Sequence, residues 1–121
     1  RLPSDATTLY NAPFALVSHG TEDDPVFNYA NVFAQQLFGY AWAEFIKLPS
    51  RLSARAPERD ERARLLELVT RQGFIGDYSG IRVRRDGTLF RISRATVWNV
   101  IDAQGVLRGQ AAMFSDIEEL Q

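Results

Sequence analysis

Few residues in this chain are of the types that perform chemistry on their own. The 121-residue sequence contains no Cys and a single His, His19. Without Cys there are no disulfides, thiolate nucleophiles, Cys-ligated zinc sites or iron–sulfur clusters, and a Ser-His-Asp triad could only be built around His19. The sequence shows no recognisable carboxylate dyad. We therefore expect that the chain is not an enzyme and holds no metal, and that His19 is a surface or hairpin-end residue.

Polar residues on one long predicted strand could instead bind a ligand. In TLFRISRATVWNVI (88–101) the even positions carry most of the bulk, so period-two alternation places them toward the interior. This orientation buries Arg94, whose charge is costly there unless it is paired or liganded. A carboxylate is the obvious partner, because a guanidinium binds it through two parallel hydrogen bonds. Alternatively, Arg94 extends to solvent at the sheet edge or pairs with Glu22, Asp23 or Asp77.

Other candidate ligand-binding residues surround the same predicted interior. The aromatics of NYANVFAQQLFGY (28–40) recur at helical spacing and form either part of the core or one wall of a pocket. Gln110 and Phe114 share one face of the last predicted strand. The full set of candidates is Phe33, Phe38, Tyr40, Arg94, Thr96, Trp98, Gln110 and Phe114.

The helices that position these residues are predicted from caps and apolar spacing. Asn31 is a suitable N-cap for a helix that ends at Gly39, and a second short helix is predicted at 42–46. PERDERARLLELVTRQG (57–73) is the clearest helix, because it has Pro and acidic residues in its first turns, an apolar stripe and a final Gly.

The predicted strands flank these helices in the sequence. The runs 13–19 and 26–30 are joined by an acidic turn and predict a hairpin. Three more strands are predicted at 77–85, 88–101 and 106–114. An Asp86-Gly87 hairpin turn joins the first two of them. Along the chain, two predicted strands are followed by helices and then by three strands. This order indicates an α+β domain with one antiparallel sheet and helices on one face.

Composition excludes several broad classes of partner. The net charge is -1 and the sequence pI is about 5.8, so we expect no nucleic acid partner, and the arginines of RVRR (82–85) and Arg91 are explained by solvated strand faces. The apolar runs are too short to span a bilayer, and no secretory signal is recognisable. We expect no membrane partner and a cytoplasmic protein.

Several motifs resemble those of PAS domains. FNYANVFAQQLFGY is similar to a PAS stretch in which a strand of the type I-x-Y-x-N leads into a helix ending L-F-G-Y, and FSDIEEL is similar to the PAS ending D-I-T-E. Within that superfamily, PFALVSHGTEDDPVFNYAN and the segment from LPSRLSARAPERDERARLLELVTRQGFI to FRISRATVWNV resemble the MEKHLA domain. The resemblance implies a PAS-like fold, a five-stranded antiparallel sheet around a helical layer, over residues 13–117. Residues 1–12 are then an N-terminal arm and residues 118–121 a C-terminal tail.

The resemblance also bears on cofactors. Light-sensing relatives that form a flavin–cysteine bond need a Cys, which this chain lacks. Flavin-binding relatives carry Asn and Gln at the positions that Ile92 and Phe114 occupy here. Haem needs an axial ligand, usually His, and His19 lies away from the helix that supplies haem ligands in related sensors. We therefore expect no cofactor.

Two functions remain open from the sequence. The first is a sensory module that binds a small molecule, with a carboxylate as one candidate, in a cavity between the sheet and the helices. The second is an interaction or homodimerisation module whose cavity is filled by its own side chains. A homodimer is expected, because related domains pair through the N-terminal arm and the outer sheet face, and both carry apolar residues here: Leu2, Leu9, Tyr10, Phe14, Leu89, Val97 and Ile101.

Overall fold

An antiparallel sheet with helices packed against it forms the framework of the protein. The computed structural model describes residues 5–120. The strands are β1 (Ala15–His19), β2 (Phe27–Ala30), β3 (Phe74–Val83), β4 (Leu89–Ile101), β5 (Leu107–Phe114) and β6 (Asp116–Leu120). They lie in the order β2-β1-β5-β4-β3, and β6 pairs with β4. The predicted α+β class and antiparallel sheet are confirmed.

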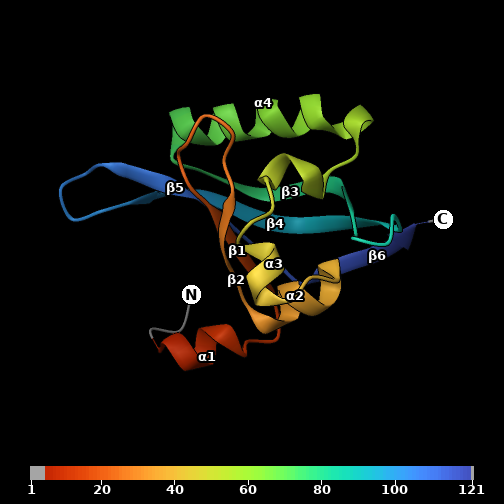
Figure 1. Ribbon diagram of the computed structural model, residues 1–121. Helices are drawn as coiled ribbons and strands as arrows, with labels where there is room; N and C mark the ends of the chain where they lie inside the picture. Colours follow the sequence, from red (N-terminus) through yellow and green to blue (C-terminus); the bar gives the residue numbers. More distant parts are fainter. Residues whose placement is uncertain (1–4, 121) are drawn as a thin grey trace.

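The helices lie at different ends of the sheet. They are α1 (Ala6–Tyr10), α2 (Val32–Phe38), α3 (Trp42–Phe45) and α4 (Ala56–Gln72), with a 3₁₀ helix at Ser50–Ser53. Helix α4 runs along β3 and β4, whereas α2 and α3 contact β1 and β2. Helix α1, which occupies much of the expected N-terminal arm, lies at the opposite end of the molecule from α4 (Figure 1).

Local sequence signals account for the boundaries of α2. Asn31 precedes the helix and its side chain accepts a hydrogen bond from the Ala34 backbone N–H at 3.1 Å, which satisfies a donor that the first turn leaves unpaired. Gly39 follows with a φ of 85°, a left-handed conformation that ends a helix at little cost when no Cβ is present. The predicted N-cap and helix end are both confirmed.

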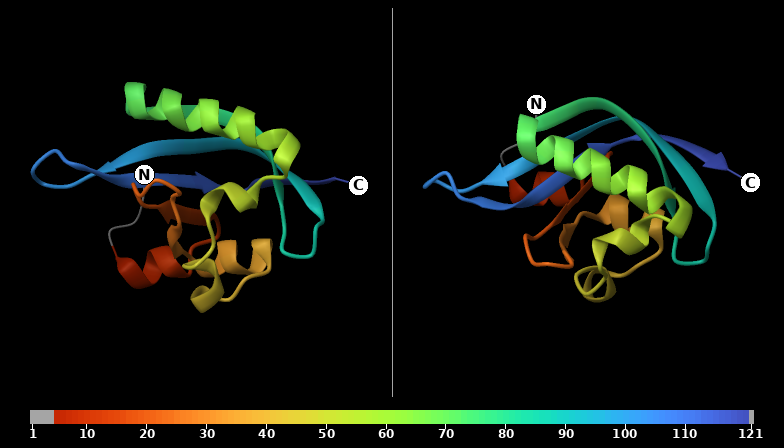
Figure 2. Two further views of the ribbon diagram at one scale, coloured as in Figure 1. Left: turned by 45° about the horizontal axis from the view of Figure 1, so that its top comes forward. Right: turned by 90° about the horizontal axis from the view of Figure 1, so that it is seen from above.

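The core lies between the inner face of the sheet and helices α2, α3 and α4. Edge-to-face aromatic pairs hold its centre, with ring centroids 5.2 Å apart for Phe38 and Phe90 and 4.9 Å apart for Phe27 and Phe45. Helix α4 adds Leu65 and Val69 to this cluster. Figure 2 shows α4 crossing over the strands, with β4 and β5 extending beyond it as a hairpin.

Strand β4 changes the face that it turns to the core partway along its length. Phe90 and Ile92 are buried in its first half, whereas Ala95 and Val97 are buried in its second half. The switch occurs where Ile92 pairs with Gly80 but Ala95 pairs with Tyr78, so that β4 contains one extra residue, a β-bulge. Even positions therefore face the core before the bulge and odd positions after it. The sequence prediction that all even positions face inward was wrong beyond Ile92.

Strand β6 continues the hairpin of β4 and β5 past the bulge. Met113 of β5 pairs with Thr96 and Asp116 of β6 pairs with Ser93, so both strands run along one side of β4. Residues 118–120, which the sequence suggests as a tail, form part of β6. The sheet therefore has a sixth strand that the sequence analysis did not predict.

Candidate ligand-binding cavity

A small cavity lies under α4, against the inner face of the sheet. Its volume is about 50 Å³, which is room for a few water molecules or a group of a few heavy atoms. Much of the wall is apolar and includes Val17, Phe27, Leu65, Ile92 and Val97. The remaining wall is polar or charged and consists of His19, Ser53, Arg62, Tyr78, Arg82 and Gln110.

Arg62 reaches this cavity from the buried side of α4. It precedes Leu65 by three residues and Leu66 by four, so the helical period places it on the stripe that faces the sheet. Its side chain is buried, yet it forms no hydrogen bond or ion pair with any residue between 5 and 120. Burial lowers the pKa of the Arg62 guanidinium to about 10, and the nearby Arg82 charge acts in the same direction. Arg62 nevertheless stays positively charged at neutral pH.

Arg82 enters the cavity from β3, where it is also buried. Its Nη1 donates to the Ile81 carbonyl at 2.8 Å and its Nη2 to the Tyr78 hydroxyl at 3.3 Å. The Tyr78 hydroxyl donates in turn to Glu61 at 2.8 Å, and the Arg82 guanidinium lies 5.6 Å from the centre of the Tyr78 ring. Arg82 thus has a fixed position but forms no ion pair with a described carboxylate. Glu61 is hydrogen-bonded to Tyr78, and Glu58 is affected by the Arg82 charge but forms its hydrogen bonds with Arg55.

His19 lies at the end of β1, on the same cavity wall as Gln110. Its Nδ1 is 2.9 Å from the Gly20 carbonyl oxygen, so in the neutral ring Nδ1 carries the proton and Nε2 is an acceptor. Nε2 is buried and has no hydrogen-bond partner. Burial lowers the pKa of the His19 imidazole below its usual value, and the Arg62 charge adds to this effect. Of the two expected positions, the hairpin end is confirmed, and the surface is wrong because His19 is buried.

Gln110 holds α4 against the sheet. Its Nε2 lies 3.0 Å from the Leu66 carbonyl, 3.0 Å from the Thr70 hydroxyl and 3.1 Å from the Asn99 side-chain oxygen. Asn99 of β4 also donates to the carbonyls of Val69 and Thr70. These bonds connect β4 and β5 to α4 at one end of the cavity.

A wider groove adjoins the cavity on its solvent side. It has a volume of about 380 Å³ and shares His19, Arg62, Leu66 and Gln110 with the cavity wall. Its other charged residues are Asp23, Asp24, Arg51, Arg59 and Glu67. Opposite charges are mixed there, and Arg51 pairs with Asp24 at 3.1 Å. The buried charge next to this groove, in contrast, is only positive.

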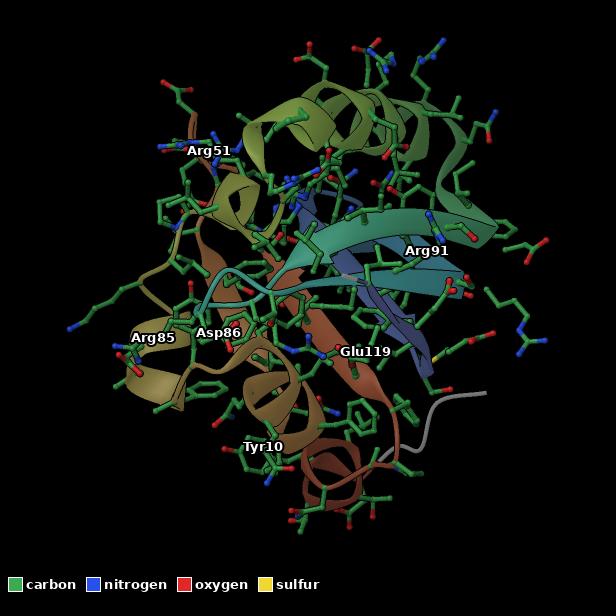
Figure 3. All side chains as sticks on the ribbon, turned by 90° about the vertical axis from the view of Figure 1, so that its right-hand side faces the viewer. Tyr10, Arg51, Arg85, Asp86, Arg91 and Glu119 are labelled. Atoms are coloured by element: carbon green, nitrogen blue, oxygen red, sulfur yellow. The ribbon has the colours of Figure 1, made fainter. Side chains whose placement is uncertain are left out.

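The structure brings three of the eight predicted ligand-binding residues to the cavity, namely Phe38, Gln110 and Phe114. Phe33 packs at the edge of the core on α2. Tyr40 stacks edge-to-face on Phe45 with the ring centroids 5.7 Å apart, and Arg85 lies 5.8 Å from the centre of its ring. Arg85, labelled in Figure 3, also pairs with Glu44 of α3 at 2.7 Å. Phe33 and Tyr40 are absent from the cavity wall.

The bulge in β4 places the other three predicted residues away from the cavity. Arg94 has a φ of 53°, and its side chain is 77% exposed and pairs with Asp116 at 2.6 Å. Thr96 and Trp98 follow the bulge on the face opposite to Ala95 and Val97. The prediction that Arg94, Thr96 and Trp98 face inward was therefore wrong, because the extra residue of the bulge shifts the alternation of β4 by one.

The sequence analysis missed the charged residues that do reach the cavity. Arg82 was assigned to a solvated strand face, but it is buried, whereas Arg91 lies at the surface and pairs with Glu118 at 3.0 Å (Figure 3). Two signals could have identified the cavity residues. Arg62 continues the apolar stripe of α4 by one turn, and Arg82 shares strand parity with Tyr78.

Two other properties follow from the described residues. Between residues 5 and 120 no group of three or more His, Asp or Glu side chains could hold a metal ion. None of the helices in that range is long and apolar enough to cross a membrane.

Comparison with known proteins agrees with the sheet and helix arrangement. The family model of the MEKHLA domain matches residues 2–119. No curated protein sequence matches the chain significantly.

Among solved structures, the chain is similar to a PAS domain of a protein from Colwellia psychrerythraea, with a TM-score of 0.80, 16% sequence identity and 93% of each chain covered. It is also similar to a light-oxygen-voltage domain studied with a flavin analogue, with a TM-score of 0.73, 16% identity and coverage of 95% of this chain and 83% of the other. An RNA-binding light-oxygen-voltage receptor matches with a TM-score of 0.75 and 19% identity, over 96% of this chain and 36% of the receptor. These likenesses establish the PAS fold.

Proposed function

We propose that this chain, which belongs to the MEKHLA domain family, is a sensory module that binds a small ligand in the cavity under α4. The observation that carries the proposal is the set of buried polar groups around that cavity. His19 Nε2 is fully buried without a hydrogen-bond partner, and the largely buried Arg62, which also borders the adjoining groove, forms no hydrogen bond or ion pair with a described residue. Buried polar and charged groups destabilise a folded protein unless something binds them. A ligand that pairs with these groups would stabilise the fold, and its presence or absence could then be sensed.

Occupancy of the cavity would reach both ends of the chain through the sheet. The cavity wall includes residues of β1, β3, β4 and β5 as well as α4. Gln110 and Asn99 tie α4 to β5 and β4 beside the cavity, so a ligand that shifts α4 would strain these bonds. Strand β5 continues directly into β6 at the C-terminal end. We propose that the output surface is the sheet together with the terminal segments.

The features of the cavity favour a proposal of binding over one of catalysis. Its only imidazole has a lowered pKa because of burial, and Nε2 of this ring is hydrogen-bonded to no described residue, so it is not paired with a nucleophile as a catalytic base would be. The small volume of about 50 Å³ favours a ligand much smaller than the molecules that fill pockets of several hundred Å³.

Native mass spectrometry of freshly purified protein, with an absorbance scan of the same sample, tests the proposal. We expect a bound mass that is lost on denaturation and a spectrum without visible absorption. Protein that carries no added mass, and that binds none of a panel of small metabolites in a thermal-shift screen, would contradict it. A coloured sample would instead indicate flavin or haem.

A homodimerisation module is the second candidate function. Apolar side chains are exposed at the start of β3 and on the hairpin of β4 and β5: Phe74 is 62%, Ile101 56% and Val106 46% exposed. Such groups often mark a surface for a partner. Sedimentation velocity of the wild type and of Ile101→Glu tests this alternative, because a dimer that uses this hairpin should dissociate in the variant. Of the residues suggested for the interface, Val97 does not fit it because it is buried, and Leu2 lies outside the described residues.

A further inference from the structure

We propose that the ligand is a small organic carboxylate, with its carboxylate group between the guanidinium groups of Arg62 and Arg82. This inference rests on the proposed function and names the chemical class of the ligand. It follows from the charge, the free donors and the shape of the cavity.

The buried charge of the cavity is positive and has no direct ion-pair partner, although Glu58 lies near enough to Arg82 for the Arg82 charge to lower the pKa of Glu58. Arg62 and Arg82 come from α4 and β3, are each less than one-tenth exposed and are close enough for the Arg82 charge to affect Arg62. Neither forms an ion pair with a described residue. Glu61 interacts with Arg82 only through the Tyr78 hydroxyl. Two like charges in a desolvated site repel each other, so an anion between them removes both the repulsion and the unpaired state.

The free donors of the two arginines fit a carboxylate. A guanidinium carries five N–H groups in a planar fork. Arg82 donates through one N–H to Ile81 and through another to Tyr78, so the rest of its fork is free, and the whole fork of Arg62 is free of bonds to the described residues. A carboxylate offers about four lone-pair sites on two oxygens and accepts from such forks in pairs.

The Tyr78 and Glu61 contacts fix the direction of the Arg82 fork. The Tyr78 hydroxyl accepts from Arg82 Nη2 and donates to Glu61 Oε1, at 3.3 Å and 2.8 Å. This chain of bonds fixes the guanidinium over the Tyr78 ring before any ligand arrives. A donor with a fixed position loses less entropy when it binds, which favours recognition of a small group.

The rest of the cavity selects for an organic rather than an inorganic anion. Aliphatic and aromatic side chains such as Val17, Phe27, Leu65 and Ile92 line the wall beyond the arginines, and they would contact a short apolar body. The volume of about 50 Å³ limits that body to a few atoms, unless the ligand extends past Arg62 into the adjoining groove. A monocarboxylate with a short aliphatic chain meets both conditions.

Binding of acetate and propionate to the purified chain tests the inference, with acetamide and propionamide as uncharged controls of the same shape. We expect the carboxylates to raise Tm and to shift the arginine Nε–H resonances in NMR spectra, and the amides to do neither. Sodium chloride at the same ionic strength controls for general screening. Equal effects of chloride and acetate would overturn the assignment of an organic carboxylate.

Variants identify the residues that hold the carboxylate. Arg62→Met and Arg82→Met should each weaken acetate binding tenfold or more, whereas Arg64→Met, on the exposed face of the same helix, should leave it unchanged. Arg62→Met should also keep or raise Tm without ligand, because it replaces an unpaired buried charge with an apolar side chain of similar length. Unchanged acetate affinity in folded Arg62→Met would overturn the inference.

The outcomes separate this inference from the proposed function. A neutral molecule found in the cavity by native mass spectrometry would overturn the carboxylate and leave a sensory module. Protein with no bound mass and no response to any small molecule would contradict both proposals. Carboxylate binding that depends on Arg62 and Arg82 would support both.

Discussion

The ring of Tyr78 lies over the backbone of Gly80 and occupies the space that a side chain at Gly80 would need. A Cβ built on Gly80 would lie 2.7 Å from Tyr78 Cζ and 3.0 Å from Arg82 Nη1. Tyr78, Gly80 and Arg82 share one face of β3, and the small middle residue allows the ring and the guanidinium to meet across it. Gly80 is therefore required for the position of Arg82 in the cavity.

We predict that Gly80→Ala displaces both neighbours. Overpacking of this kind costs about 1–3 kcal/mol of stability, and loss of the Tyr78–Arg82 contact should also weaken carboxylate binding. Chemical denaturation measures the first effect and a thermal-shift titration with acetate the second.

Gly76→Ala is the matched control for this change. Gly76 lies in the same strand, and a Cβ built there has no neighbour within 4 Å. Its substitution should change neither stability by more than about 0.5 kcal/mol nor binding. Equal effects at the two positions would show that the Tyr78 ring adapts and that Gly80 has no special role.

The bulge at Arg94 leads to a second prediction. A left-handed φ suits Gly and is strained for β-branched residues, so Arg94→Val should destabilise the protein by about 1–3 kcal/mol. Arg94→Gly should be tolerated, because the exposed pair with Asp116 contributes at most about 1 kcal/mol. Urea denaturation of the two variants measures the difference, and both should bind acetate like the wild type. A loss of binding in either variant would return Arg94 to the ligand site.

The bulge also explains which parts of the fold the sequence could predict. Caps, turns and apolar runs are local, and they identified the helix after Asn31, the Asp86-Gly87 turn and the strands that flank it. The bulge depends on pairing with β3, where Asp77 also has a positive φ of 56°. No local signal in RISRAT (91–96) indicates it, so the inward orientations predicted for Arg94, Thr96 and Trp98 were wrong.

The site was partly predictable for a different reason. Phe38, Gln110 and Phe114 follow from simple periodicity and do line the cavity. Arg82 was assigned to solvent, and Arg62 was not singled out, because charged residues are rarely buried without partners. Both arginines are exceptions to that rule, and the exception is seen only when α4 and β3, the two elements that carry them, are placed side by side in the fold.

Asn31 gives a third prediction, because it joins three segments with one side chain. Its Oδ1 accepts from the backbone N–H groups of Leu16 and Ala34, both at 3.1 Å, and its Nδ2 donates to the carbonyls of Phe14 at 2.8 Å and Leu9 at 3.1 Å. Asn31 is fully buried. We predict that Asn31→Ala costs about 3 kcal/mol or more, because several buried backbone groups lose their partners together.

Helix α1 should respond first to this change, since the bond to Leu9 attaches it to the fold. Hydrogen exchange in Asn31→Ala should therefore accelerate in Ala6–Tyr10 more than in α4. Asn31→Asp separates the role of Asn31 as a helix cap from its role as a donor to Leu9 and Phe14. It keeps the oxygen that accepts from the first turn of α2 but places an oxygen atom opposite the Leu9 and Phe14 carbonyls. Unchanged exchange in α1 in both variants would show that other contacts hold this helix.

His19 gives the last prediction, which concerns pH. Burial is the main cause of its lowered pKa, the Arg62 charge lowers it further, and the Gly20 carbonyl and Glu22 act in the opposite direction. The other charged residues of the adjoining groove are Asp23, Asp24, Arg51, Arg59 and Glu67. In the unfolded chain the imidazole returns to about 6.5.

The direction of the effect follows from proton uptake. Between the folded and the unfolded pKa of His19, the unfolded state binds more protons, so the free energy of unfolding falls as the pH falls below about 6.5. The free energy of unfolding should stop falling from this cause below the pKa that His19 has in the folded protein. Carboxylates with lowered pKa values, such as Glu58 and Asp102, lose their contribution only at lower pH, near and below the ordinary values of such groups.

Urea denaturation from pH 7.5 to pH 5, on the wild type and on His19→Asn, measures this contribution. The Asn side chain can still donate to the Gly20 carbonyl but does not titrate in this range, so the variant should lose less stability as the pH falls. A bound carboxylate should raise the pKa of His19, because an anion near Arg62 favours the charged imidazole. Acetate should therefore bind more tightly at pH 6 than at pH 8 in the wild type, and equally at both in His19→Asn. The same pH dependence in both proteins would place the titrating group elsewhere.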